Sequence, residues 1–389
     1  MSVRPGWEGV AEAFATNIAA GDEVGAGCAV YHRGELVVDL VGGHFDAART
    51  QPYTDEALQL VFSTTKGVTA IAVAMCVQRG LLDYDEKVST YWPEFAANGK
   101  GDATVAQLLS HQCGLFSVDR PITLSEALDW KTITARLAEG KPEWPIGTAH
   151  GYHALTYGWL AGELIRRTDG RSPGQFVAEE IAEPLGLDLW IGLPAEQEPR
   201  VSPIVGGLVA HSDEPAVQAM IDQFFGPGSN AYRALFLDGT FASGGDGDSL
   251  FNRPEVHAAE IPAANGITNA RSLAKLYAAT LGPVDGIQLL DDDVRERART
   301  KITPDGETDA CLLIESAFGM GFMVYAPYTP FAGPGSYGHP GAGGSVTFAQ
   351  PERELAFSYV MNLMASNLAG DLRAQRLIDA AAAAADAAG

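Results

Sequence analysis

The stretch Val61-Phe62-Ser63-Thr64-Thr65-Lys66-Gly67 places a hydroxyl and an amine three residues apart, at the expected start of a helix. Apolar residues recur at helical spacing from 64 to 80, and Gly80 stands where a helix C-cap is expected, which predicts a buried helix. Because residues three apart on a helix share a face, Ser63 and Lys66 point the same way. A partly desolvated lysine can remove the proton of an attacking alcohol, so these two residues are candidates for base and nucleophile.

The same spacing occurs a second time, at Ser272-Leu273-Ala274-Lys275. This copy lies within an expected amphipathic helix that begins near 268–271, and Lys275 is predicted to face water there. A Ser-x-x-Lys pair is a short pattern, so spacing alone does not choose between the two copies.

Two further segments supply what such a pair needs. The loop 143–154 ends in Tyr152, at the start of an expected helix over 155–167. A phenol near a lysine ammonium can act as a proton carrier for Ser63, although Tyr152 could equally be an ordinary core aromatic. The segment 337–345 places glycines beside an apolar strand, which lets a backbone edge approach a substrate closely.

Together these segments resemble the serine β-lactamase and penicillin-binding-protein superfamily, and within it the family VIII carboxylesterases. Ser63-Thr64-Thr65-Lys66 is similar to the nucleophile motif, and Tyr152-His153-Ala154 is similar to the tyrosine motif. His339-Pro340-Gly341 stands where class C β-lactamases have Lys-Thr-Gly. The segment 108–115 resembles the family's Leu-Leu-Thr-His-x-Ser-Gly-Leu, and the order of all four segments matches the family.

The resemblance implies a reaction through an acyl-enzyme. Ser63 would attack the carbonyl, Lys66 and Tyr152 would share the role of general base, and water would release the acyl group. The backbone N–H groups of Ser63 and Ala342 would hold the oxyanion. Which of Lys66 and Tyr152 accepts the proton stays open, because the two groups titrate as one coupled system.

Departures from the β-lactamase pattern bear on the substrate. Ala154 stands where class C enzymes have Asn, and His339 and Pro340 replace the cation and hydroxyl that receive the β-lactam carboxylate. Neutral carboxylic esters of small to medium size are therefore predicted, with His339, Gly341 and His153 as substrate contacts. A β-lactamase, a D-aminopeptidase or amidase, an acyltransferase, or a non-enzymatic penicillin-recognising protein remain the alternatives.

The expected fold is α+β and β-lactamase/transpeptidase-like, with an antiparallel sheet flanked by helices plus an inserted, mainly helical lobe. Residues 1–80 and 260–389 are predicted to form the sheet domain, and 81–259 the helical lobe with long loops. A Gly turn joins the expected strands 25–32 and 35–43 into a hairpin. Further expected strands are 318–325, 344–349 and 354–362. The expected helices are 104–109, 125–137, 155–167, 175–185 and 371–387, with 194–264 as loops.

The composition of the chain excludes some classes of binding partner. The 389 residues contain 26 Lys and Arg against 49 Asp and Glu, for a formal charge of −23, which disfavours nucleic acid and anionic membranes. No stretch is apolar enough to span a bilayer and no leader pattern is visible, so a cytoplasmic protein acting on a small-molecule ester is expected. The oligomeric state is not indicated. Cys28, Cys76, Cys113 and Cys311 are expected to be buried thiols.

Three other patterns have simpler explanations. Gly170-Arg171-Ser172-Pro173-Gly174 matches the nucleophile elbow of α/β-hydrolases, but Ser172 and Pro173 are more typical of a helix start. The segment 333–338 matches a dinucleotide pattern without a βαβ unit, and is predicted to be a loop. His150 and His153 lack a third ligand, so neither metal nor cofactor is expected. Aromatic residues that could line a pocket, or simply pack the core, are Phe62, Phe116, Trp144 and Trp159.

Overall fold

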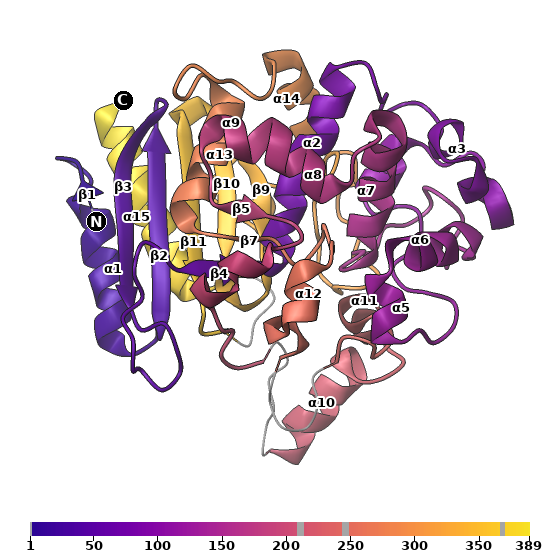
Figure 1. Ribbon diagram of the computed structural model, residues 1–389, viewed down its shortest axis with the longest axis horizontal. Helices are drawn as coiled ribbons and strands as arrows, with labels where there is room; N and C mark the ends of the chain where they lie inside the picture. Colours follow the sequence, from indigo (N-terminus) through magenta and orange to yellow (C-terminus); the bar gives the residue numbers. More distant parts are fainter. Residues whose placement is uncertain (1, 208–213, 243–248, 366–369) are drawn as a thin grey trace.

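A seven-stranded antiparallel sheet forms one half of the molecule (Figure 1). The computed structural model describes residues 2–207, 214–242, 249–365 and 370–389. In spatial order, the strands are β1 (Ser2–Val3), β3 (Glu35–Gly43), β2 (Gly25–His32), β11 (Leu355–Met361), β10 (Val346–Gln350), β9 (Tyr337–Pro340) and β8 (Met323–Val324). Strand β2 thus lies between a strand that follows it directly and a strand from the far end of the sequence.

The predicted hairpin is confirmed. Strands β2 and β3 pair antiparallel, and both residues of the connecting turn have positive φ, 53° at Arg33 and 75° at Gly34. Such a turn matches the natural twist of two paired strands. All eight residues of β2 are buried, as expected for a strand at the centre of a sheet that is covered on both faces.

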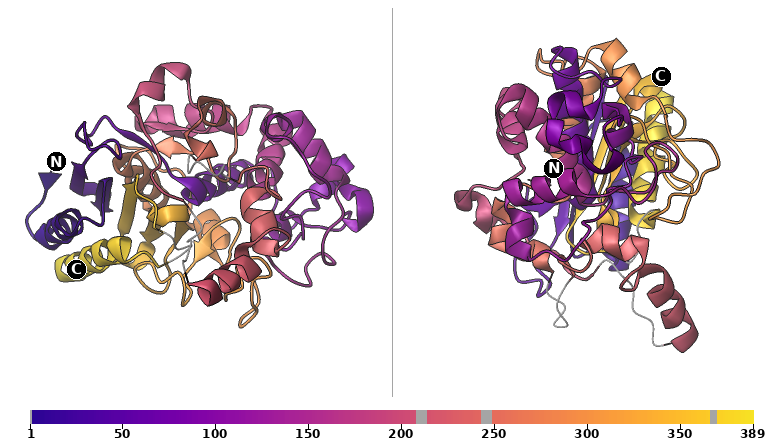
Figure 2. Two further views of the ribbon diagram at one scale, coloured as in Figure 1. Left: turned by 90° about the horizontal axis from the view of Figure 1, so that it is seen from below. Right: turned by 90° about the vertical axis from the view of Figure 1, so that its right-hand side faces the viewer.

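Helices cover both faces of the sheet (Figures 1 and 2). They are α1 (Glu8–Ala20), α2 (Thr65–Gln78), α13 (Ala270–Leu281) and α15 (Leu372–Ala388), while α14 (Asp292–Arg299) packs against α2. Helices α1 and α15 pack against each other and against β3 and β11, while α13 packs on β2, β10 and β11. The expected C-terminal helix over 371–387 is confirmed as α15.

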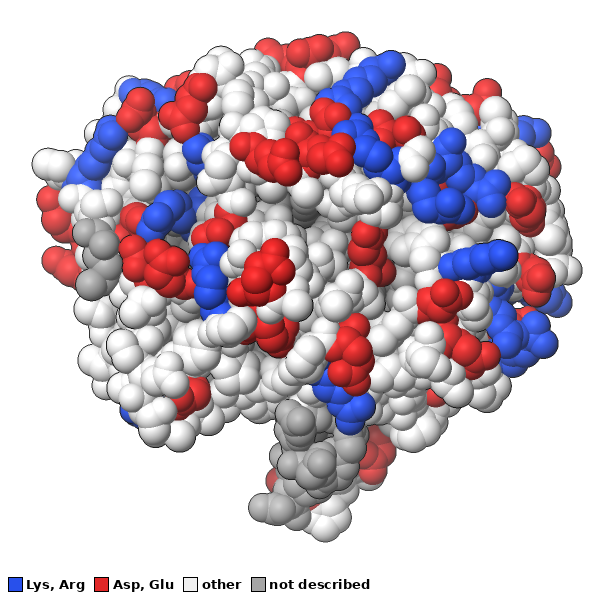
Figure 3. All heavy atoms as spheres, in the orientation of Figure 1, with Lys and Arg blue, Asp and Glu red and all other residues white. Residues whose placement is uncertain are grey.

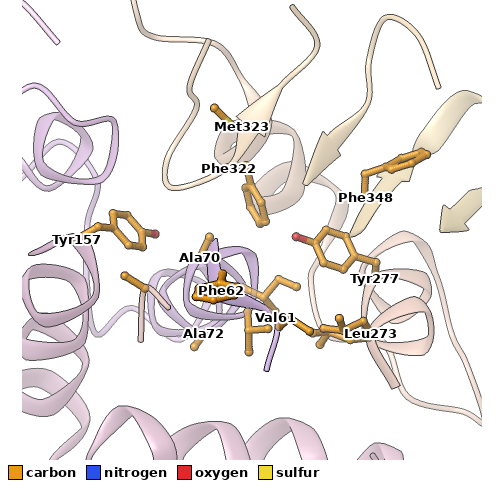
Figure 4. Close-up of a cluster of buried hydrophobic side chains, with 14 of the residues drawn as sticks. Val61, Phe62, Ala70, Ala72, Tyr157, Leu273, Tyr277, Phe322, Met323 and Phe348 are labelled. Atoms are coloured by element: carbon orange, nitrogen blue, oxygen red, sulfur yellow. The ribbon is translucent and has the colours of Figure 1, made fainter. Parts of the chain in front are cut away.

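Helix α2 is the central element of the core. It follows a 3₁₀ turn over Phe62–Thr64, and its residues from Thr65 to Cys76 are all buried, which confirms the helix expected over 64–80. A helix that is apolar all round must be enclosed on every side. Figure 4 shows Tyr157, Tyr277 and Phe322 around it, contributed by three different segments. Because α2 cannot move without disturbing this packing, residues on its first turn have fixed positions.

The described chain between residues 81 and 259 is mainly helical. Its α-helices are α3 (Val88–Tyr91), α4 (Val105–Leu109), α5 (Leu124–Leu128), α6 (Trp130–Glu139), α7 (Thr156–Asp169), α8 (Pro173–Val177), α9 (Glu183–Leu185), α10 (Pro215–Phe225), α11 (Asn230–Phe236) and α12 (Pro254–Ala258). The helices expected over 104–109 and 155–167 are confirmed as α4 and α7. The helix expected over 125–137 is two helices, because Asp129 ends α5 and caps α6. The helix expected over 175–185 is divided into α8 and α9 by a π-helical turn at Ala178–Ala182.

The prediction of loops alone over 194–264 is wrong, because α10, α11 and α12 lie there. The residues that suggested loops are helix starters in this context: Pro215 and Pro254 begin α10 and α12, and Ser229 caps α11. Figure 1 shows α10 projecting from the lower edge of the molecule. Residues 208–213 and 243–248 of this segment lie outside the described residues.

The expected strands near the end of the sequence are confirmed with shifts. Only Met323–Val324 of the range 318–325 is a strand, and β10 begins at Val346 because Ala342–Gly344 forms a 3₁₀ turn. Strand β9 was not predicted, since two of its four residues are Gly and Pro. A second, small sheet was also not predicted. It consists of β5 (Leu189–Trp190), β7 (Ile267–Thr268), β4 (Leu58–Leu60) and β6 (Val201–Ser202), strands too short to show alternation.

The four cysteines are free and buried, as expected. In the described part of the chain, no helix has the length and apolarity needed to cross a bilayer. On the face drawn in Figure 3, basic side chains lie next to acidic ones. Ion pairs among the described residues include Arg79–Glu180, Arg171–Glu179 and Arg200–Asp188.

Candidate active site

Ser63 lies on a strained turn that is fixed by the end of strand β9. Phe62, the residue before it, has φ 45°, a conformation that costs energy for a side chain of this size. Ser345 Oγ donates to Val61 O at 3.0 Å and lies 3.1 Å from Thr64 Oγ1. A Cβ at Gly341 would overlap Val61 O. Gly341 was predicted to allow close approach of a substrate, but the approach that requires a glycine here is that of the Ser63 turn.

Lys66 is completely buried beneath Ser63, and its amine has three oxygen neighbours. Nζ lies 3.1 Å from Ser63 Oγ, and it donates to Ala154 O at 2.6 Å and to Ala263 O at 3.0 Å. Burial lowers the pKa of Lys66 well below its ordinary value of 10.5. A neutral amine has two N–H groups and one lone pair, so the two carbonyls accept the former and the lone pair is left for the Ser63 hydroxyl.

The segment that supplies one of these carbonyls was missed by sequence reasoning. Residues 261–266 run along α2: Pro262 O accepts from Thr69 Oγ1 at 2.6 Å, and Gly266 N–H donates to Thr65 Oγ1 at 2.8 Å. The buried Asn265 side chain holds this segment in shape, accepting from Ile261 N–H at 2.9 Å and donating to two further carbonyls. Ala263 O is thereby fixed against the Lys66 amine.

Tyr152 approaches the same serine from the loop that precedes α7. Its hydroxyl hydrogen-bonds to Ser63, and its ring centroid is 4.7 Å from Lys66 Nζ. Burial raises the pKa of Tyr152 above its ordinary value of 10, and the hydrogen bond to Ser63 opposes that rise only in part. The phenol is therefore protonated near neutral pH, next to an amine whose charged form is disfavoured.

Asp309 positions Tyr152 through the backbone, and no sequence pattern pointed to it. Its buried carboxylate accepts from three backbone N–H groups, those of Tyr152 at 3.0 Å and of Cys311 and Leu312 at 2.8 Å each. The second oxygen accepts from Ser316 Oγ at 2.9 Å. A carboxylate that accepts four hydrogen bonds holds the backbone at Tyr152 in a fixed position. Asp309 lies 157 residues from Tyr152 in the sequence.

His339 is stacked on Tyr152, with ring centroids 5.9 Å apart and planes inclined by 28°. Nδ1 lies 2.6 Å from Pro340 O, and Nε2 has no hydrogen-bond partner among the described residues. Burial, with a smaller contribution from Lys66, lowers the pKa of His339 to about 3. The ring is therefore neutral at pH 7, and the segment His339-Pro340-Gly341 presents no cation to a substrate.

His153 has a structural position, contrary to the prediction that it contacts substrate. Its ring is completely buried, with Nε2 accepting from Leu115 N–H at 2.9 Å and Nδ1 lying 2.6 Å from Gly151 O. The backbone N–H of His153 donates to His111 Nδ1 at 3.1 Å. His150 is likewise buried, with Nε2 3.2 Å from Ser316 Oγ. Within the described residues, no group of three His, Cys, Asp or Glu side chains is arranged to hold a metal ion.

A pocket opens beside Ser63 and is lined by uncharged residues. Its described lining comprises Phe62, Ser63, Ala154, Leu155, Gly206, Gly207, Leu235, Phe236, Phe241, Ser249, Phe251, Ala264, Ala342 and Met364. Ser63 and Ala342, the two predicted oxyanion donors, are both in this lining. Of the four aromatic residues that could either line a pocket or pack the core, Phe62 is in this lining. Phe116 and Trp159 are buried in the core, and Trp144 stacks on Phe116.

Similarity to a known protein family extends over nearly the whole sequence. The sequence profile of the Beta-lactamase family matches residues 10–382. The chain belongs to the β-lactamase family. The family membership and the predicted β-lactamase/transpeptidase-like fold are thus both confirmed.

Relatives within the β-lactamase family cover nearly the whole chain. Esterase/beta-lactamase LipL of Mycobacterium tuberculosis is 35% identical over 370 residues, which are 92% of this chain and 82% of the relative. A family VIII carboxylesterase of known crystal structure has a TM-score of 0.87 and 35% identity, with 99% of both chains covered. A penicillin-binding protein homologue from Caulobacter crescentus has a TM-score of 0.86 and 38% identity, also with 99% of both chains covered.

The other sequence patterns that suggested a site have structural roles. Ser172 caps α8 with Pro173 at the first helical position, and its Oγ donates to Glu260 at 2.6 Å, so the nucleophile-elbow pattern is a helix start. The segment 333–338 leads into strand β9, as expected of a loop. In the second Ser-x-x-Lys copy, Lys275 was predicted to face water, but its amine is bonded to protein groups. Its Nζ donates to Leu185 O and pairs with Asp285, both at 2.7 Å, and the side chain is 18% exposed.

Proposed function

We propose that this protein hydrolyses neutral carboxylic esters through an acyl-enzyme on Ser63. The observation that carries the proposal is the Lys66 amine, buried, 3.1 Å from Ser63 Oγ and bonded otherwise to two carbonyls. A carboxylate partner would keep the lysine charged, whereas carbonyl partners in a desolvated site leave its lone pair free to accept a proton. The names of two relatives, an esterase/β-lactamase and a family VIII carboxylesterase, support the same activity.

The order of steps follows from the protonation states. Lys66 accepts the Ser63 proton as Oγ bonds to the ester carbonyl carbon, and the carbonyl oxygen becomes the oxyanion between the N–H groups of Ser63 and Ala342. As the tetrahedral intermediate collapses, the protonated Tyr152 delivers a proton to the departing alcohol and regains one from Lys66. Water then attacks the acyl-enzyme with the same groups in reverse order. We propose that the lysine, rather than the tyrosine, is the first proton acceptor, since burial lowers the pKa of Lys66 and raises that of Tyr152.

The pocket favours an uncharged acyl group. None of its fourteen described lining residues carries a charge, and four of them are phenylalanines. A buried carboxylate without a partner would be costly there, whereas an aliphatic or aromatic acyl chain would be stabilised by about 25 cal/mol for each Å² removed from water. We infer that the substrate is an uncharged ester of small to medium size.

Labelling and a substrate pair test the proposal. A fluorophosphonate probe, followed by mass spectrometry of the peptides, is expected to modify Ser63 alone. Modification of Ser172, or of no serine, would contradict the assignment. A short-chain chromogenic ester is expected to give a far larger kcat/KM than a chromogenic cephalosporin, and the reverse order would overturn the ester assignment.

A second candidate is hydrolysis of β-lactams at the same serine. It is favoured by one observation, the esterase/β-lactamase LipL among the relatives. Against it, His339 stands where class C β-lactamases have lysine and is neutral at pH 7, and none of the described lining residues is a cation that could receive a β-lactam carboxylate. The cephalosporin arm of the same experiment measures this activity directly.

A further inference from the structure

The turn over Ala342–Gly344 is hydrogen-bonded by a buried arginine, Arg373. Arg373 lies in the first turn of α15, and its side chain is only 7% exposed. Its Nη2 donates to Gly343 O at 2.8 Å, and Ala365 N–H donates to the same oxygen at 2.9 Å. The carbonyl of Gly343, the residue after Ala342, is therefore fixed by two donors, one of them a charged side chain from another element.

The turn is also packed too closely to shift. Gly344 has φ 125°, and a Cβ there would overlap Asp371 Oδ2, the carboxylate oxygen that lies 2.6 Å from Arg373 Nη2. On the other side, a Cβ at Gly343 would lie 2.8 Å from Cγ of Met364, which lines the pocket. The turn over Ala342–Gly344 is thus confined between the Arg373–Asp371 pair and the pocket wall.

Arg373 is itself anchored to the sheet domain, independently of the turn. Its Nη1 donates to Leu363 O at 2.9 Å, to Asp22 O at 3.1 Å and to Glu23 Oε2 at 3.2 Å. Glu23 also accepts from the buried Tyr359 hydroxyl, on strand β11. One nitrogen of the guanidinium therefore bonds to residues beside the sheet, and the other bonds to Gly343 O. The two nitrogens of an arginine can bind two separate sets of acceptors, whereas a lysine has a single nitrogen.

We propose that Arg373 is a positioning residue for the oxyanion hole. By fixing Gly343 O relative to the sheet, it keeps the Ala342 N–H directed at the oxygen of the reacting carbonyl. The proposal rests on the proposed function, because it takes Ala342 as an oxyanion donor. An N–H that stabilises charge only in the transition state affects kcat and leaves ground-state binding of the ester unchanged.

The test compares Arg373→Met with Arg376→Met. Arg376 is three residues further along α15, and its Nη1 donates to Asn17 Oδ1 at 2.8 Å. For a neutral chromogenic ester, R373M is expected to lower kcat about 10- to 100-fold with KM within about twofold of wild type, because a donor displaced by a fraction of an ångström loses much of its effect. R376M is expected to keep both constants. The rate of Ser63 labelling by a fluorophosphonate should fall by the same factor as kcat, since its P=O oxygen occupies the same site.

Arg373→Lys keeps the design informative if R373M does not fold. Lysine retains the charge but has one nitrogen, so we expect a loss of about 10-fold in kcat at unchanged KM, in a protein whose thermal midpoint is close to that of wild type. Wild-type kcat in either folded variant, or a loss that appears equally in R376M, would overturn the inference. If wild-type protein fails to hydrolyse esters, the proposed function falls, and the labelling rates still decide the role of Arg373.

Discussion

The two Ser-x-x-Lys segments have identical spacing, but their lysines have opposite surroundings. Lys66 is completely buried, and its amine meets Ser63 Oγ and two backbone carbonyls. Lys275 is partly exposed and lies 2.7 Å from the Asp285 carboxylate. Its serine, Ser272, accepts from Asp188 N–H at 3.0 Å and so serves to join α13 to the loop before β5.

The difference shows which property makes a lysine a base. Spacing only places the hydroxyl and the amine on one helix face, and both copies satisfy it. An anionic partner stabilises the ammonium, whereas burial with neutral acceptors disfavours it. The identity of the partners, which tertiary structure supplies, therefore decides whether the amine can accept a proton.

The largest expected effect comes from removing each serine hydroxyl. Ser63→Ala should lower kcat/KM for a chromogenic ester by about 10⁴-fold or more, because the nucleophile is lost. Ser272→Ala should stay within about twofold of wild type. Comparable losses in the two variants would remove the basis for the comparison.

Replacing the lysines gives the next effect. Lys66→Met should lower kcat/KM about 10³-fold, since a positioned general base contributes about 10² to 10⁴. Lys275→Met serves as the matched control and should retain wild-type kcat/KM. Steady-state kinetics with one ester measures both, and substantial activity in K66M would point to Tyr152 as the base.

The pH dependence sharpens the assignment of the base. Protonation of Lys66 removes its lone pair, so kcat/KM should fall about tenfold per pH unit as pH drops below the pKa of this amine. Because burial lowers that pKa well below 10.5, activity should reach its plateau well before pH 10.5. The profile of K275M should coincide with that of wild type. A rate that still rises steeply at pH 10 would show that Lys66 is charged in the free enzyme.

The smallest effect concerns stability. Lys275→Met removes a hydrogen bond to Leu185 O and an ion pair with Asp285, whose side chain is 73% exposed, so the pair itself adds little. Unfolding in urea should show a loss of about 1 kcal/mol, mostly from the hydrogen bond. Asp285→Asn should cost less than K275M, and a larger cost would indicate that the ion pair dominates.

The sequence was sufficient to predict which serine, lysine and tyrosine come together in the structure. Ser63, Lys66 and Tyr152 lie in local motifs whose order is typical of a family, and the fold follows from the same resemblance. Hairpin β2–β3 and helix α2 were also predictable, because their patterns are long and regular. The division into residues 1–80 with 260–389 and 81–259 stays a prediction.

The remainder of the site depends on contacts between distant segments. Asp309 anchors Tyr152 across 157 residues, and Ala263 O reaches Lys66 across 197. Neither Asp309 nor Asn265 belongs to a pattern that spacing could reveal, since each acts on backbone groups that only the fold brings near. The prediction for His153 failed for the same reason: its neighbour Tyr152 reaches Ser63, while the His153 ring hydrogen-bonds to Leu115 and Gly151.

The pairing of β2 with β11 has a consequence for biosynthesis. It joins residues 25–32 to 355–361, so the middle of the sheet cannot close until most of the polypeptide has left the ribosome. A nascent chain displays the Ser63 alcohol early, but the Ala342 amide and Arg373 emerge only near the end. Until then the edge of β2 is open to wrong partners, and a chaperone would have most to protect there. Under the proposed mechanism, Ser63 therefore lacks one of its two oxyanion donors until this late segment has been made.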